Sequence, residues 1–230
     1  MITMRPNSER GLTRTPWLTS YHTFSFGYYF NSEFTNFRSL QVINEDFIKP
    51  KHGFSDHSHH DMEIITIVFQ GSLTHTDNLG HQCRISQGEI QRMTAGTGIT
   101  HRETNENSDQ EVHLFQIWIE PWEEGLEPSY QQSHFSPSPN EIIMIAAPTP
   151  LEQGVHINQN ATISLGLFDD HHVTAYPCDS HRGYWLHVVE GELSVNEMIL
   201  TSGDGMGIEQ ETSLLLRANK KSVFLLFELS

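Results

Sequence analysis

The chain has 230 residues, 37% of them hydrophobic and 10% aromatic, so it can bury a core in one large all-β domain or two small ones. It carries 29 acidic against 13 basic residues and has no Lys or Arg from Glu103 to His181. The resulting net charge of −16 argues against direct nucleic-acid binding and against docking on an anionic membrane, and it fits a solvated acidic surface.

The N-terminus (MITMRPNSERG) is polar and lacks the apolar core of a signal peptide, and no run of 18 apolar residues follows it. We therefore expect a soluble, cytoplasmic protein. Cys83 and Cys178 are the two cysteines, too few for a disulfide framework, and we expect both to be free thiols.

The segment from Trp17 to Phe37 holds nine aromatic residues. Two interpretations stay open for it. The rings could line the path of a planar substrate, or they could pack on the outside of a barrel, which is the commoner use of such side chains and the one we favour.

Two pairs of metal-binding residue types come next. Successive side chains of a strand point to opposite faces, so His57 shares a face with His59, and His101 shares one with Glu103. An isolated His-x-His is weak and fits a polar loop equally well. The second pair, following the glycine-rich turn at 96–98, changes the balance, because two such strands can bring three imidazoles and a carboxylate to one metal ion.

Short apolar runs rich in β-branched and aromatic residues recur along the chain, with turn signals between them. The clearest are residues 64–69, 112–119, 142–147 and 223–229. Many short strands with regular turns predict an all-β sandwich or closed barrel.

The chain is expected to form two similar halves. The stretch 121–140 is rich in Pro, Ser and Glu, with room for one helical turn, and the junction is placed there, dividing the chain into residues 1–130 and 131–230. A weak internal repeat supports this division: the segment from Met62 aligns with that from Arg182, which matches Gly71 with Gly191 and Gly88 with Gly203.

Residues 53–64 and 93–105, together with 22–26 and 40–46, are similar to the pirin family. The similarity is specific over about residues 17–132 and holds only in outline beyond them. It implies two jelly-roll barrels of the cupin type (a bicupin) with a metal ion in the N-terminal barrel. It also implies, for bacterial members, an oxygenase that opens the flavonol quercetin.

The resemblance also selects among the carboxylates. Strand alternation permits either Glu63 or Glu103 as a ligand, whereas pirins use the position of Glu103. The implied ligands are then His57, His59, His101 and Glu103. Glu63 is left as an orienter of a ligand histidine or a proton acceptor, and either Glu103 or Glu63 takes the substrate proton. Iron is the expected metal, with nickel, copper, manganese and zinc as alternatives.

The C-terminal barrel is not expected to hold a metal. The positions that match the four ligands are Pro177, Asp179, Leu216 and Ala218, which cannot form such a site, so this half is interpreted as a structural partner of the first.

The function expected is a metal-dependent dioxygenase that acts on a small planar flavonol with dioxygen. Two alternatives remain. One is a redox-responsive regulatory module that works through a protein partner, as eukaryotic pirins are thought to do. The other is a different metal enzyme on the same fold.

Overall fold

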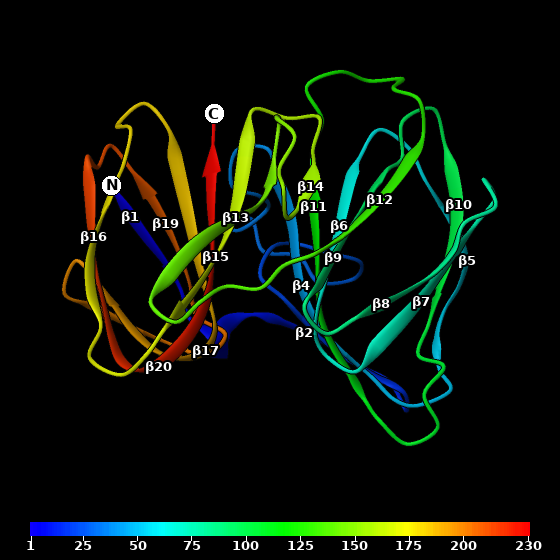
Figure 1. Ribbon diagram of the computed structural model, residues 1–230, viewed down its shortest axis with the longest axis horizontal. Coiled ribbons are helices and arrows are strands. Elements are labelled where there is room, and N and C mark those ends of the chain that lie inside the picture. The colour runs from blue at the N-terminus through cyan, green and yellow to red at the C-terminus, as the bar shows by residue number, and fades with distance from the viewer. The chain divides into compact units, whose positions relative to one another are not determined.

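The computed structural model describes residues 1–230 and consists of twenty strands and one 3-10 turn, Asn7–Glu9, which confirms the all-β prediction (Figure 1). Its contacts divide the chain into two compact units. The N-terminal unit comprises Gly11–Phe135 and Pro148–Gln159; the C-terminal unit comprises Met1–Arg10, Ser136–Ala147 and Asn160–Ser230. The structure contains no helix whose length and hydropathy would allow it to cross a bilayer.

Two antiparallel sheets make up the barrel of the N-terminal unit. The larger sheet has the order β12-β9-β6-β11-β4-β3-β2, and the smaller has the order β5-β10-β7-β8. The strands of the N-terminal unit are β2 (Gly11–Arg14), β3 (Leu18–His22), β4 (Leu40–Ile48), β5 (Gly53–His59), β6 (Glu63–Gln70), β7 (Ser72–Asp77), β8 (Gln82–Ser86), β9 (Glu89–Thr94), β10 (Ile99–Thr104), β11 (Val112–Ile119), β12 (Ser129–His134) and the short β14 (Val155–His156).

The apolar runs identified in the sequence become the core strands. β11 spans the predicted residues 112–119, and β6 extends the predicted 64–69 by one residue at each end. Both strands lie inside the larger sheet, with neighbours on each side, and most of their residues are buried. This explains their near-continuous apolar sequence, because a strand covered on both faces gains from apolar residues at odd and even positions alike.

The C-terminal unit holds a second set of strands, in the order β1-β19-β17-β20-β15-β13, with β16 on β20 and β18 on β17. Its strands are β1 (Ile2–Arg5), β13 (Glu141–Ala147), β15 (Ala161–Phe168), β16 (Val173–Pro177), β17 (Gly183–Val195), β18 (Met198–Thr201), β19 (Gly205–Glu209) and β20 (Ser213–Leu229). β13 and β20 contain the two remaining predicted strands. Leu216 and Ala218, which match ligand positions of the first barrel, are buried in an apolar cluster with Phe224 and Leu193.

The four glycines aligned in the repeat share one backbone conformation. Gly71, Gly88, Gly191 and Gly203 have φ of 75°, 81°, 96° and 86°, a region that favours glycine. At Gly191 a Cβ atom would also lie 2.1 Å from the Lys221 carbonyl oxygen. The repeat therefore preserves the turns that need glycine, although β17 runs on through Gly191 with irregular register where the first copy has two strands, β6 and β7.

The two compact units have different boundaries from the predicted domains, residues 1–130 and 131–230. The stretch 121–140 contains no helical turn; it contains β12, which pairs with β9 of the N-terminal unit. At the other end, β1 pairs with β19, so the first ten residues join the C-terminal unit. Cys83 and Cys178 are free, as predicted.

Candidate metal centre

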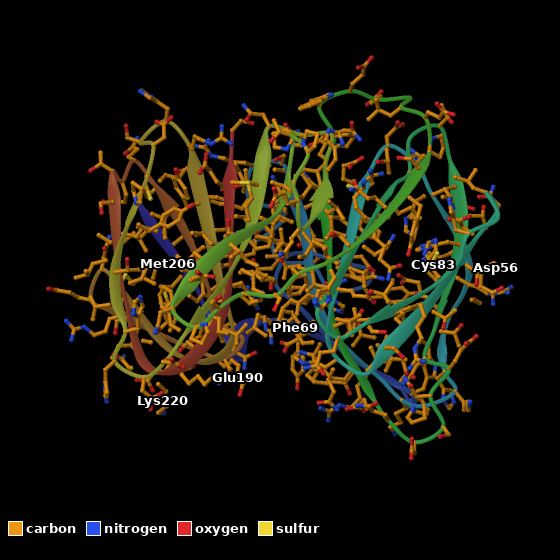
Figure 2. All side chains as sticks on the ribbon, viewed as in Figure 1. Asp56, Phe69, Cys83, Glu190, Met206 and Lys220 are labelled. Atoms are coloured by element: carbon orange, nitrogen blue, oxygen red, sulfur yellow. The ribbon has the colours of Figure 1, made fainter.

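The smaller sheet of the N-terminal unit places the predicted ligands side by side. β10 is an inner strand, with β5 on one side and β7 on the other. His101 of β10 lies directly opposite His57 of β5 and Asp77 of β7, and Glu103 lies opposite His75. Directly opposed residues point to the same face of a sheet, so all of these side chains project into the barrel. Asp56 and Cys83, labelled in Figure 2, belong to β5 and β8 of this sheet.

Three histidines form the centre of the site. The ligand nitrogens of His57, His59 and His101 all lie within 4.8 Å of one another, with ring centroids 4.4 to 5.0 Å apart. The Nδ1–H of His57 donates to the Ser55 carbonyl oxygen at 2.8 Å, which leaves Nε2 with its lone pair for a metal. The pattern His-x-His thus places two imidazoles of one strand, β5, in the cluster.

Glu103 joins this cluster through His101. Its carboxylate lies within 4.8 Å of the ligand nitrogens of His101 and His75. The side chain is buried; Oε2 accepts a hydrogen bond from Gln116 Nε2, and Oε1 has no partner. The structure therefore brings the three predicted histidines together, and it places Glu103 beside His101 and His75.

The electrostatics of the cluster suit metal binding. Burial, followed by the charges of neighbouring histidines, lowers the pKa of His59 to about 4 and that of His101 to about 2. Both imidazoles are neutral at physiological pH, as a ligand must be. Burial, with the nearby charge of Asp46, raises the pKa of Glu103 to about 8. A cation beside Glu103 would stabilise its charged form.

Two orphaned atoms show that the residues fit a metal ion. His101 Nε2 and Glu103 Oε1 are buried and lack any hydrogen-bond partner. A buried polar atom without a partner destabilises a fold by about 1–3 kcal/mol. A divalent transition metal would satisfy both atoms at once, and three imidazoles with one carboxylate form a donor set that such metals accept.

Glu63 lies outside the cluster. Its carboxylate oxygens accept hydrogen bonds from Asn158, one from the backbone N–H and one from the side-chain amide, both at 3.2 Å. Arg92 Nε lies 3.9 Å from the same carboxylate, in a buried ion pair. Glu63 belongs to β6 of the larger sheet, whereas the histidines belong to the smaller one.

Sequence reasoning missed His75 and Asp77. His75 Nδ1 lies 3.2 Å from His101 Nδ1, and His75 Nε2 lies 2.9 Å from Asp77 Oδ2. Both residues are buried on β7. Their signal was present in the sequence, because His75-x-Asp77 has the same spacing as the two ligand pairs and also follows a glycine turn.

A pocket of about 520 Å³ opens beside the histidines. His57, His59 and Glu103 form part of its wall. Five aromatic side chains also line it: Trp17, Phe26, Tyr28, Phe54 and Trp118. The Trp118 ring meets His59 edge to face, with centroids 5.0 Å apart. Flat apolar walls beside a few polar groups are typical of a site for a small aromatic molecule.

The aromatic segment 17–37 is divided between the pocket wall and the packed interior. Trp17, Phe26 and Tyr28 line the pocket, and Tyr28 is also exposed to solvent. Phe24 and Phe34 are buried as packing residues.

One wall of the pocket is polar and hydrogen-bonded. The Thr13 hydroxyl lies 2.8 Å from His22 Nε2, and His22 Nδ1 lies 2.8 Å from Asn44 Oδ1. Asp46 stands on the same wall with only 2% of its surface exposed, and its Oδ1 has no partner. Burial raises the pKa of Asp46 to about 7, against a lowering by the Ser20 hydroxyl. The pocket thus contains a second carboxyl group besides Glu103.

Comparison with known proteins agrees with this architecture. A family model described as Pirin matches residues 4–119, and one described as a quercetinase C-terminal cupin domain matches residues 144–229. A quercetin 2,3-dioxygenase of Escherichia coli K12 is 35% identical over 100% of this chain and 99% of its own. A pirin-like protein of Caulobacter vibrioides is 34% identical over 95% of each chain. The crystal structure of a bacterial pirin from E. coli in complex with nickel(II) superposes with a TM-score of 0.95 at 35% identity, covering 100% of this chain and 99% of the other.

Proposed function

This chain belongs to the pirin family and has its bicupin fold, and from that premise we propose that it is a metal-dependent dioxygenase that opens the heterocyclic ring of a flavonol such as quercetin. The observation that carries the proposal is that an aromatic-lined pocket opens onto the candidate metal centre. An aromatic-walled pocket of about 520 Å³ has His57, His59 and Glu103 in its wall. A planar ligand held between those rings would meet the metal centre at its edge.

We assign His57, His59, His101 and Glu103 as the residues that hold the metal, and iron as the first metal to test, with nickel, copper, manganese and zinc as alternatives. When bound, the metal supplies Lewis-acid polarisation of the flavonol hydroxyl and a template that orients the reactants. Dioxygen is the oxidant, and both of its atoms enter the opened product.

The residues of the chain supply orientation and proton handling. The rings of Trp17, Phe26 and Trp118 exclude water and hold the substrate plane. Asp46 lines the same pocket and has a carboxyl oxygen, Oδ1, without a hydrogen-bond partner, so this carboxylate is a candidate to accept the hydroxyl proton. Glu103 is the other candidate for this step. The contacts of Glu63 with Asn158 and Arg92 favour a structural role for that residue over the proton-accepting one.

The test follows quercetin and oxygen together. Protein loaded with one metal at a time should consume the quercetin absorbance only in the presence of oxygen, with one dioxygen taken up per quercetin lost. A fully metallated protein that leaves quercetin unchanged would refute the dioxygenase and leave the regulatory module and a different metal enzyme as the alternatives.

A pair of neighbouring histidines provides the matched control. His59→Ala should lose both metal and activity, because His59 belongs to the cluster. His60→Ala should keep both, since the His60 side chain is 82% exposed and stands outside the cluster. Full metal content in His59→Ala would contradict the ligand assignment.

A further inference from the structure

A buried His-Asp pair stands directly behind the metal ligand His101. Asp77 lies opposite His101 in the β7–β10 ladder, and His75 lies opposite Glu103. His101 Nδ1 is 3.2 Å from His75 Nδ1, and His75 Nε2 is 2.9 Å from Asp77 Oδ2. The side chains of His75 and Asp77 are fully buried. The three groups form an unbroken chain that leads from the ligand into the β7–β8 turn.

Only one proton arrangement satisfies every member of the chain when the imidazoles are neutral. A carboxylate accepts hydrogen bonds and cannot donate, so His75 Nε2 carries the proton that faces Asp77. The Nδ1 of His75 is then an acceptor, and His101 Nδ1 must donate to it. His101 Nε2 is thereby left without a proton, and this is the buried nitrogen that has no partner.

The turn holds Asp77 in place. Its Oδ1 accepts hydrogen bonds from the backbone N–H groups of Leu79 at 3.0 Å and His81 at 3.1 Å. Its Oδ2 also lies 2.9 Å from His81 Nδ1. The Tyr130 ring covers the pair from β12, with centroids 5.0 Å from both His75 and His81. The carboxylate is therefore a rigid anchor at the far end of the chain.

The same contacts decide between two roles for His75. Its position close to His101 and Glu103 would also allow a role as a ligand. Both of its nitrogens are engaged, however, one with His101 and one with Asp77, so that neither is free to bind a metal.

We propose that His75 and Asp77 are positioning residues, which fix His101 in the tautomer that offers Nε2 to the metal. The inference rests on the metal centre of the proposed function, and it does not depend on which substrate that centre uses. Hydrogen-bonded partners behind a ligand histidine orient the ring and raise its basicity, and their loss typically weakens metal binding by about 10- to 100-fold.

Asp77→Asn is the informative variant because the structure predicts how the new amide will lie. The two backbone N–H groups at Oδ1 need an acceptor, so the amide oxygen stays there and the NH₂ group faces His75. His75 Nε2 must then accept, its proton moves to Nδ1, and His101 is driven to the Nε2–H tautomer. Metal binding through Nε2 then requires this proton to move first, which weakens binding.

Two measurements test the proposal without using the enzymatic reaction. The first is the affinity of the metal-free protein for Co²⁺, from competition with a chelator; Asp77→Asn should bind about 10- to 100-fold more weakly. The second is the His101 tautomer, from ¹⁵N-histidine NMR of the metal-free protein: a proton on Nδ1 in the wild type and on Nε2 in Asp77→Asn. His75→Phe, which removes the acceptor, should weaken Co²⁺ binding as well.

His81→Ala is the matched control, because it removes a donor to the same carboxylate and leaves the His75 contact intact. It should bind Co²⁺ within about twofold of the wild type. The proposal is overturned if Asp77→Asn keeps wild-type affinity, if His81→Ala loses as much as Asp77→Asn, or if wild-type His101 carries its proton on Nε2. The His101 tautomer of the wild-type protein tests the proposal even if the variants do not fold. Wild-type protein that binds Co²⁺ but leaves quercetin unchanged when loaded with each of the metals named under the proposed function would refute the dioxygenase alone.

Discussion

Replacing Asp46 by Asn should reduce the pH dependence of stability in the metal-free protein. Burial raises the pKa of this carboxyl from 3.8 to about 7 in the folded state. The folded protein therefore binds more protons than the unfolded chain between these values, and the free energy of unfolding falls as the pH rises through this window. A pKa shift of one unit corresponds to about 1.4 kcal/mol, so ionising Asp46 lowers the free energy of unfolding by about 4 kcal/mol in all. About 2 kcal/mol of this loss occurs between pH 5.5 and 8.

Urea unfolding at pH 5.5 and pH 8, followed by tryptophan fluorescence, measures this difference. Asp46→Asn should lose about 2 kcal/mol less than the wild type over that interval, because Asn carries no proton to release. Asp109→Asn is the control, since Asp109 is exposed in the loop between β10 and β11 and should leave the pH dependence unchanged. Parallel pH curves for Asp46→Asn and the wild type would refute a buried carboxyl that is protonated at mildly acidic pH.

Three further predictions concern the metal, the pocket and the second barrel. Glu103→Gln removes the negative charge of the proposed carboxylate ligand and should weaken Co²⁺ binding at least about tenfold by chelator competition, and unchanged affinity would contradict this assignment. Trp118→Ala opens the aromatic wall beside His59, so the KM for quercetin should rise several-fold while the metal content by elemental analysis stays the same. Gly191→Ala places a Cβ 2.1 Å from a carbonyl oxygen at a φ of 96°, and should lower the stability of the C-terminal unit by about 1–3 kcal/mol in urea while leaving Co²⁺ affinity unaltered.

Local sequence patterns predicted the features that depend on strand alternation. The run at residues 112–119 became β11 because its apolar residues fill both faces of an inner strand. The pairs His57 with His59 and His101 with Glu103 converged because each pair keeps its alternation within a single strand.

The features that were not predicted depend on which strands pair. Glu63 has the same parity as His59, but the chain leaves the smaller sheet between them, at residues 60–62, where Asp61 has a φ of 47°. Odd and even positions therefore do not tell whether residues on the two sides of this break face the same side of a sheet. His75 and Asp77 reach the site because β7 pairs with β10, and the pairing of Met1–Arg10 with the C-terminal unit has the same long-range origin. A single sequence does not display such pairing.

β5 lies at the edge of its sheet and is paired on one side only, with β10. The bulge between His101 and Glu103 interrupts even that ladder, and Ser55, Asp56 and Ser58 face solvent. A bound ion would cross-link the edge strand to its inner neighbour, because His57 and His59 lie on β5 and His101 and Glu103 lie on β10. Release of the metal would loosen β5 before the rest of the barrel, so the mobility of this exposed strand would report whether the metal site is occupied.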